Sequence, residues 1–267
     1  MKQKNKFPPK NNNFLSANQV LVYGRHSVFA ALLNPRRKIH QILITQNSES
    51  DLKQFITDKK INLDQSLIKI VDNDHLFSLF PSGSTHQGFV LKTSPITIFS
   101  FNYFLDKIQK IEKANLPPLL VLDNLTDPHN IGAIIRSAVS FGFKNIIVNE
   151  RIFPIQSAVI AKTASGMLEL VDLIAANNLN SCLADLKQLG YWSVGLDGEA
   201  KTYISKAKDY QPIALVLGSE GDGIRRLVKE NCDLLVKISI NSEVESLNAS
   251  NAAAIAMYEI SKHSDEL

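Results

Sequence analysis

Cysteine is nearly absent from this chain of 267 residues, which contains Cys182 and Cys232 and no others. The two residues stand far apart and form neither a CxxC pair nor a metal-ligand cluster. We therefore expect a reducing compartment, the cytoplasm, and no bound metal. No apolar run approaches the roughly 20 residues of a membrane-spanning helix, and the first residues lack the apolar core of a secretory signal. These absences predict a cytoplasmic protein that does not cross a membrane.

Acidic residues are absent from the beginning of the chain, where Glu49 is the first. A basic segment without acids suits the phosphate backbone of a nucleic acid. For residues 1–13 a disordered solubilising tail is an equal alternative, and an organelle transit peptide would favour Arg and Ser over the Lys and Asn found here. We expect residues 1–18 to form a basic flexible tail. The basic residues before Glu49 are Lys2, Lys4, Lys6, Lys10, Arg25, Arg36, Arg37 and Lys38.

The remaining chain has an ordinary composition, 45% hydrophobic and 21% charged, and is long enough for two modest domains. From residue 19 to 94, short β-branched segments alternate with helical ones, which predicts a small α/β domain. Residues 95–117 carry Pro near both ends and a charged middle, so we interpret them as a linker.

Residues 118–267 show a second alternation, which predicts a parallel sheet covered by helices on both faces. The expected strands are "LLVLDN" at 119–124, "NIIVNE" at 145–150, "YWSVGLD" at 191–197, "IALVLGS" at 213–219 and "LLVKISI" at 234–240. An Ala-rich helix is expected at about 247–262.

The first motif, "LDNLTDPHNIGAIIRSAVSFG", follows the first of these strands. Asn130 is a good N-cap for an amphipathic helix, and Gly132 lets another group approach its first turn. Arg136 lies off the apolar stripe. A solvated surface arginine explains it within this segment alone, whereas an anion held at the helix start would give it a role as a clamp.

The second motif, "IALVLGSEGDGI" at 213–224, leads a strand into a glycine-rich loop that carries Glu220. Glycines at a strand end mark a ligand crevice in open α/β sheets. The spacing matches neither a dinucleotide-binding fingerprint nor a P-loop. A tight strand–helix turn would also explain this motif.

The third motif, "ISINSEVESLNASNAAAIAMYEI" at 238–260, ends a strand in a polar loop and then begins the Ala-rich helix. Helix capping alone would explain Ser246 and Asn248, and this role is compatible with catalysis.

Together, "NIGAIIR" at 130–136, "LGSEGDG" at 217–223 and "ESLNASNAAAI" at 245–255 resemble the SpoU (TrmH-like) family of RNA ribose 2′-O-methyltransferases, in the SPOUT superfamily. "YGRHSVFAALL" at 23–33 and "HQGFV" at 86–90 resemble the N-terminal domain, similar to ribosomal protein L30e, of one subgroup. That subgroup methylates a guanosine ribose in large-subunit (23S-type) ribosomal RNA.

The resemblance implies an L30e-like RNA substrate-binding domain at 19–94 and a methyltransferase domain with a trefoil knot at 118–267. It implies S-adenosylmethionine as cofactor and a homodimer, with the helix at 247–262 in the subunit interface and Ala253 and Ala256 at the contact. The partner would be large-subunit ribosomal RNA or its assembly intermediate.

The resemblance also implies roles for particular residues. Arg136 would be the leading catalytic residue, and since a guanidinium stays protonated we prefer a clamp on the phosphate to a general base. The expected supporting residues are Asn130, Glu220, Ser246 and Asn248. The expected cofactor-binding residues are Leu217, Gly218, Ile238 and Leu247, and the expected RNA contacts are Arg25, His26, His86 and Gln87, with a structural role open for both histidines.

Two alternatives stay open at this point. One is a 2′-O-methyltransferase that acts on transfer RNA or on another ribosomal RNA site. The other is a ribosome-assembly factor that keeps the fold and binds RNA without catalysis.

Overall fold

The computed structural model describes residues 15, 18–81, 83–149, 151–154 and 157–262. The chain divides into two compact units, the first ending at Ile96 and the second beginning at Thr97. The expected basic tail, residues 1–18, lies almost entirely outside the described residues.

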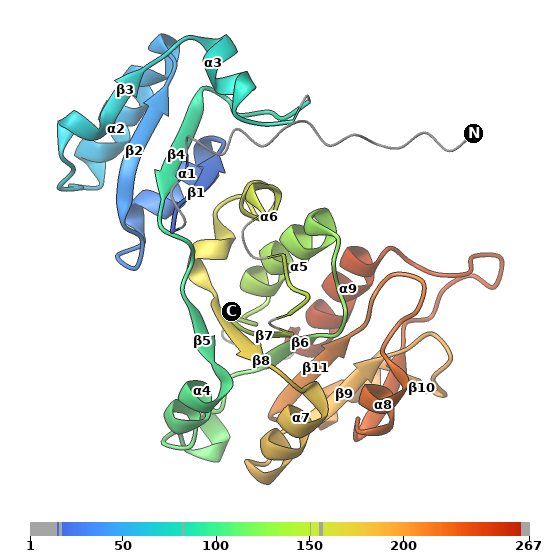
Figure 1. Cartoon of the computed structure of the whole chain (residues 1–267). Helices are drawn as coiled ribbons and strands as arrows, with labels where there is room; N and C mark the ends of the chain where they lie inside the picture. Colours follow the sequence, from blue (N-terminus) through green and yellow to red (C-terminus); the bar gives the residue numbers. More distant parts are fainter. Residues whose placement is uncertain (1–14, 16–17, 82, 150, 155–156, 263–267) are drawn as a thin grey trace. The chain divides into compact units, whose positions relative to one another are not determined.

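The first unit is built on a mixed four-stranded sheet in the order β1-β4-β2-β3 (Figure 1). The central strand β4 pairs antiparallel with β1 and β2, and β3 lies parallel to β2. The strands are β1 (Val20–Tyr23), β2 (Ile39–Ile44), β3 (Ile68–Ile70) and β4 (Phe89–Thr93), and the helices are α1 (Arg25–Leu33), α2 (Glu49–Asp58) and α3 (Asn73–Ser78). The predicted α/β domain is thus confirmed, with α3 as an additional helix.

The second unit contains an eight-stranded parallel sheet in the order β10-β12-β9-β11-β6-β7-β8-β5. The parallel sheet predicted from the alternation is confirmed, and three strands join it that the pattern did not indicate, namely β5, β8 and β10. The strands are β5 (Ile98–Ser100), β6 (Leu119–Leu122), β7 (Asn145–Asn149), β8 (Asp172–Ala176), β9 (Trp192–Leu196), β10 (Thr202–Tyr203), β11 (Ile213–Leu217) and β12 (Leu234–Lys237). The order of the strands in the sheet does not show whether the chain passes through one of its own loops. The trefoil knot therefore stays a prediction.

Helices cover both faces of this sheet, as Figure 1 shows. One face packs against α4, α7 and α8 through a buried cluster that includes Phe104, Leu183 and Val228. The other carries α5, α6 and α9, and α5 contacts both of its neighbours. The helices are α4 (Phe101–Ile108), α5 (Pro128–Ser140), α6 (Ala158–Thr163), α7 (Leu179–Gln188), α8 (Arg226–Glu230) and α9 (Ala249–Ser261), with the short 3₁₀ segment η5 (Ile204–Asp209) beside α9.

The interpretation of residues 95–117 as a linker is wrong for most of the segment. β5 pairs with β8 at the edge of the sheet, and α4 buries Phe104 and Ile108 in the core. Composition did not predict these two elements, because the strand is short and the outer face of α4 is charged. Most of the segment is therefore part of the second unit.

The first-motif helix α5 has the predicted amphipathic pattern, with Ile131, Ile134 and Ile135 fully buried. The group that approaches Gly132 is α6 of the same unit. A Cβ at position 132 would lie 2.6 Å from the Thr163 Cβ and 2.9 Å from the Ile160 carbonyl oxygen. Gly132 therefore serves close packing of two helices, and not ligand access.

The Ala-rich helix α9 turns its smallest residues inward. Ala253 and Ala256 are fully buried within the unit itself, next to Met257. The interpretation of these alanines as subunit contacts is therefore wrong. The exposed apolar side chains of α9 are Ile255 and Tyr258, which are 41% and 54% exposed.

Candidate active site

The three motifs lie at one edge of the sheet because every strand is parallel. Motif 1 starts at the last residue of β6, motif 2 consists of β11 and the loop after it, and motif 3 follows β12. The polar loops of all three therefore lie where strands end at their carboxyl termini. β11 lies directly beside β6, with Leu217 paired to Leu122. In open α/β sheets this edge is where ligands bind.

The glycine-rich loop of motif 2 folds back on itself in a way that requires its glycines. Ser219 and Gly223 exchange two backbone hydrogen bonds, each with an N···O distance of 3.0 Å. A Cβ at Gly218 would lie 2.0 Å from the Gly223 carbonyl carbon, and Gly221 and Gly223 have φ angles of +88° and +65°. Residues with a Cβ would distort this loop.

An ion pair between the buried Asp123 and the exposed Arg225 fixes the far end of the loop. Asp123 follows β6 and is fully buried. Its carboxylate accepts the backbone N–H of Arg225 at 2.8 Å and the Nε of the same residue at 2.7 Å, and it lies 2.7 Å from the second guanidinium nitrogen. Charge-assisted bonds of this kind hold geometry well. The strands β6 and β11 are thereby joined a second time, beyond their ladder.

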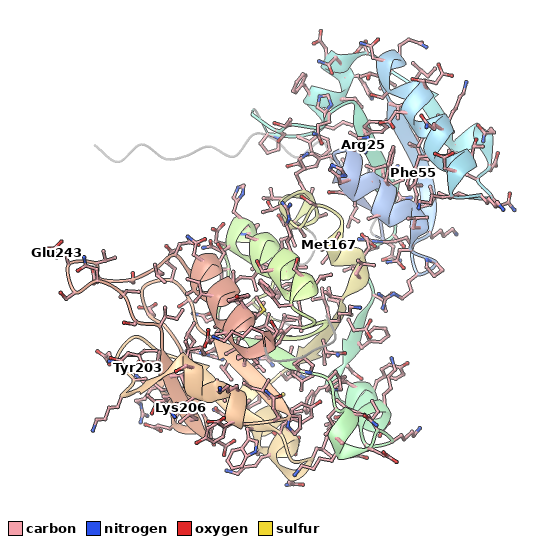
Figure 2. The ribbon with its side chains drawn as sticks, turned by 180° about the vertical axis from the view of Figure 1, so that it is seen from behind. Arg25, Phe55, Met167, Tyr203, Lys206 and Glu243 are labelled. Carbon is pink, nitrogen blue, oxygen red and sulfur yellow. The ribbon has the colours of Figure 1, made fainter. Side chains whose placement is uncertain are left out.

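A pocket of about 450 Å³ lies beside this loop, and all four predicted cofactor residues line it: Leu217, Gly218, Ile238 and Leu247. Glu220 and Ser246 also line it. Its outer wall is the segment between β12 and α9, which projects from the unit, with Glu243 near the tip (Figure 2). The pocket combines apolar side chains with a backbone surface that glycine leaves open.

The pocket also has a wall that the sequence did not indicate, formed by residues 196–199 after β9. Asp197 lies 2.6 Å from Lys229, and the exposed Glu199 lies 3.7 Å from the same ammonium group. The hydrogen bond with Asp197 raises the pKa of Lys229. A strand followed by Asp197-Gly198 at the same sheet edge is the signal that could have identified this wall.

The lining of the pocket is strongly acidic. Five carboxylates and one ammonium group belong to it, so the local field favours a cationic ligand. The carboxylates are those of Asp197, Glu199, Glu220, Asp222 and Glu245.

Three predicted residues form a continuous hydrogen-bonded relay, one from each motif. The Asn130 amide donates to a Glu220 carboxylate oxygen at 2.9 Å, and its own oxygen accepts from the Asn248 amide at 3.0 Å. The oxygen of Asn248 then caps α9 by accepting the Ser250 N–H at 3.0 Å. Asn130 is 6% exposed, so the relay fixes the orientation of a nearly buried amide.

The N-cap of α5 differs from the predicted one by three residues. Asp127 accepts the backbone N–H groups of His129 and Asn130, at 3.1 and 3.4 Å. The amide of Asn130 is therefore released from capping and available for the relay.

Arg136 lies two residues beyond the buried Ile134, on the exposed face of α5. Within the described part of the chain, its guanidinium makes no hydrogen bond or ion pair. It does not line the pocket, and neither do Asn130 and Asn248. The structure thus brings Asn130, Glu220 and Asn248 into contact, and leaves Arg136 and Ser246 without a link to them.

The residues of the first unit that were predicted to contact RNA differ in how exposed they are and in the bonds they already make. Arg25 holds Asp51 through two bonds of 2.6 and 2.8 Å, its backbone N–H donates to Gln87, and it lies 4.7 Å above the Phe29 ring. His26 is exposed.

His86 has a structural position instead of an exposed one. It is 3% exposed, its Nδ1 accepts the Gly88 N–H at 3.1 Å, and its ring meets the edge of Phe77. This burial corrects the prediction that His86 contacts RNA, because the side chain is not accessible in the folded unit. It supports the structural role that the sequence left open.

None of the helices among the described residues is long and apolar enough to cross a membrane. No group of three His, Cys, Asp or Glu side chains in that part of the chain is arranged to hold a metal ion.

Comparison with known protein families gives two matches. Residues 117–258 match the SpoU rRNA Methylase family, and residues 21–98 match the RNA 2′-O ribose methyltransferase substrate binding domain.

Relatives that match most of this chain fall into two groups by name. The 23S rRNA (guanosine-2′-O-)-methyltransferase RlmB of Vibrio parahaemolyticus is 36% identical over 242 residues, which cover 89% of this chain and 94% of that protein. An uncharacterized tRNA/rRNA methyltransferase of Synechocystis is 32% identical over 253 residues, which cover 95% of this chain but 65% of that longer protein.

The fold also has counterparts among solved structures. The SpoU methyltransferase AviRb of Streptomyces viridochromogenes, in complex with the cofactor AdoMet, superposes with a TM-score of 0.75 at 21% identity. The match covers 95% of this chain and 93% of that one.

Proposed function

The chain belongs to the SpoU family of RNA 2′-O-ribose methyltransferases, and on this premise we propose a specific reaction for it. It transfers a methyl group from S-adenosylmethionine to the 2′-hydroxyl of a guanosine ribose in large-subunit ribosomal RNA. The observation that carries the proposal is the relay of Glu220, Asn130 and Asn248, which unites three motifs beside the pocket.

The size and charge of the pocket suit S-adenosylmethionine. The molecule carries a sulfonium and an ammonium group against one carboxylate, and the acidic lining favours its net positive charge. Leu217, Ile238 and Leu247 offer apolar surface for its adenine ring, and Gly218 allows it to approach the backbone. When bound, it supplies an electrophilic methyl group.

Arg136 is the residue that we propose for clamping the RNA. Its guanidinium is exposed and free of partners in the described chain, so it is available for a phosphate oxygen next to the reacting ribose. A planar guanidinium binds phosphate with two parallel hydrogen bonds and lowers the pKa of a nearby hydroxyl by its charge. It does not itself act as a base, because it stays protonated. The proton of the hydroxyl leaves through that phosphate or through water.

The relay keeps the groups around the ribose in place. Asn130 and Asn248 orient each other, and Glu220 prevents Asn130 from rotating. Ser246, which lines the pocket, donates a hydrogen bond to the nucleotide in this proposal. Reactions of this type depend on orientation, which fixed amides supply without rearrangement during the reaction.

Two further parts of the proposal come from the family. The first unit selects the RNA, with Arg25, His26 and Gln87 as candidate contacts, and two chains form a homodimer. The substrate is the ribosomal RNA itself or an assembly intermediate of the large subunit.

A second candidate reaction is methylation of transfer RNA or of another ribosomal RNA site. The name of the uncharacterized tRNA/rRNA methyltransferase of Synechocystis includes both kinds of RNA and therefore supports this candidate. A comparison of 2′-O-methyl sites in RNA from a deletion strain and its parent decides between them. Loss of one guanosine site in large-subunit RNA is the expected result, and a change confined to transfer RNA would refute the proposal.

Binding of the cofactor provides an independent test against a non-catalytic assembly factor. Calorimetry with S-adenosylmethionine should give a saturable isotherm. A chain that assembles on ribosomal RNA but gives no heat with the cofactor would contradict the proposed reaction.

A further inference from the structure

A second cavity, of about 500 Å³, opens where β7 and β8 end. Its walls combine the end of β7, the start of α7 and the start of α8. We call it the amide groove, because four asparagines line it together with two arginines: Asn149, Asn177, Asn178, Asn180, Arg225 and Arg226. The sequence motif "NNLN" at 177–180, which the proposed reaction does not use, supplies three of the four asparagines.

Three of the four asparagine oxygens, those of Asn149, Asn178 and Asn180, are already engaged within the protein. The oxygen of Asn149 accepts the Arg151 backbone N–H at 3.1 Å, and that of Asn178 accepts the Asn180 backbone N–H at 2.9 Å. Because a backbone N–H requires an acceptor, these bonds fix which end of each amide is the oxygen.

The same reasoning applies to Asn180. Asn231 donates to the Leu227 carbonyl at 2.7 Å, which fixes its amino end, and that amino group lies 3.4 Å from the Asn180 oxygen. Within the described residues, no amino group of the four groove asparagines donates a hydrogen bond. The groove therefore offers hydrogen-bond donors.

The charge of the groove comes from Arg226. Asp123 neutralises Arg225, whereas the Arg226 side chain is 78% exposed and pairs with Glu230 one turn along α8. Exposed ion pairs of this kind contribute little to stability, so Arg226 can leave Glu230 for another anion. No acidic side chain is among the described residues that line the groove. The groove thus offers the amino groups of asparagines as donors and the guanidinium of Arg226 as a cation, without a carboxylate among its described lining residues. Such a site favours an anion with several acceptor oxygens, such as a phosphodiester.

The groove lies close to the proposed cofactor pocket. Residues 217–224 line the pocket, and the next residues of the same segment, 225–228, line the groove. Along the sheet, β11 and β7 are separated by β6 alone, which corresponds to about 10 Å at the usual strand spacing. A polymer whose reacting sugar lies at the pocket can reach the groove with a neighbouring phosphate.

We propose that the amide groove binds the phosphodiester backbone of the RNA strand next to the methylated nucleotide. This inference rests on the proposed function, because it assigns the groove to the same substrate. Arg226 contacts a phosphate as a cation, and the amide of Asn177 donates to phosphate or sugar oxygens. These contacts are independent of base sequence and position the strand.

The test is fluorescence anisotropy of the full chain with a labelled oligouridylate over a series of salt concentrations. R226Q should bind severalfold more weakly and reduce the slope of log K against log salt by about 0.7, the value for one phosphate on a single strand. N177D, which places a carboxylate in the groove, should weaken binding further. K110Q is the matched control, since Lys110 is exposed beyond the end of α4, where the chain has returned to the opposite edge of the sheet.

Each outcome bears on the inference. Affinity and salt slope equal to wild type in both R226Q and N177D would overturn it, and so would an equal loss in K110Q, which would indicate an effect of total charge.

Failure of the proposed function has a different signature. It would appear as absence of cofactor binding or methyl transfer in the wild-type chain, measured separately. The oligouridylate experiment does not depend on either result, so the two failures can be distinguished.

Discussion

The side-chain amide of Asn130 donates to the carboxylate of Glu220 at 2.9 Å, across 90 positions of sequence. The bond joins the start of α5 to the glycine-rich loop after β11. It also sets the orientation of Asn130, whose oxygen then faces the amide of Asn248. The position of α5 relative to the pocket is therefore fixed by polar contacts as well as by packing.

N130D tests this relay. The substitution replaces the donor with a second carboxylate close to Glu220, and two carboxylates at this distance cannot both be ionised without a large cost. We expect methyl transfer to fall by at least about tenfold and stability to fall by about 1–3 kcal/mol, the usual cost of a buried group that loses its partner. Denaturant unfolding and a methyl-transfer assay measure the two effects.

The control for N130D is N115D, because Asn115 is exposed and distant from the three motifs. It should change neither quantity. Normal turnover by N130D at neutral pH would show that the relay does not support catalysis.

R136A should abolish methyl transfer and leave affinity for S-adenosylmethionine nearly unchanged. Arg136 is exposed and does not line the pocket, so its removal disturbs neither the fold nor the cofactor. R136K should also fail, because an ammonium group cannot form two parallel bonds to a phosphate. Single-turnover assays beside calorimetry separate the two quantities, and near-normal turnover by R136K would rule out the clamp.

Much of this arrangement could be predicted from sequence, because it follows from local pattern. The apolar stripe of α5 and the glycines after β11 are properties of neighbouring residues, and so is the cap at Asn248. The contact between Asn130 and Glu220, in contrast, does not follow from local pattern. Nothing near residue 130 indicates that Glu220 will face it, since only the parallel order of β6 and β11 brings the two loops together.

The errors also have physical reasons. β5 has three residues and lies at the sheet edge, so it has little periodicity to detect. His86 follows a polar loop and has the composition of a surface residue, yet Phe77 covers it. For α9, alanine indicated close packing correctly but did not indicate whether the neighbour belongs to the same chain.

G218A should disrupt the glycine-rich loop. Its Cβ would lie 2.0–2.2 Å from backbone atoms of Gly223 and Ile224, which cannot move without breaking the bonds between Ser219 and Gly223. We expect cofactor binding to be lost and thermal stability to fall. G198A is the control for stability, because a Cβ there meets nothing within 4 Å. An unchanged isotherm with G218A would mean that the loop does not hold the cofactor.

G132A should destabilise the second unit without touching the pocket. The added methyl would force α5 and α6 apart, since its nearest contacts include the Ile160 carbonyl oxygen and the backbone nitrogen of Ala164. Overpacking of this kind typically costs about 1–3 kcal/mol. The free energy of unfolding in urea measures it, and a gain in stability, as expected for Gly to Ala in an unconstrained helix, would contradict the close contact.

The last prediction concerns the proposed homodimer and the outer face of α9. Ile255 is 41% exposed and Tyr258 is 54% exposed, with its ring against Phe141, the residue that follows α5. If two chains meet through this face, I255R places a charge in an apolar contact and should dissociate the dimer while each protomer stays folded. A253R differs, because Ala253 is fully buried within its own unit, and we expect it to unfold the protomer. Light scattering and circular dichroism on both variants separate the two effects. A wild-type chain that is fully active as a monomer at micromolar concentration would refute the interface.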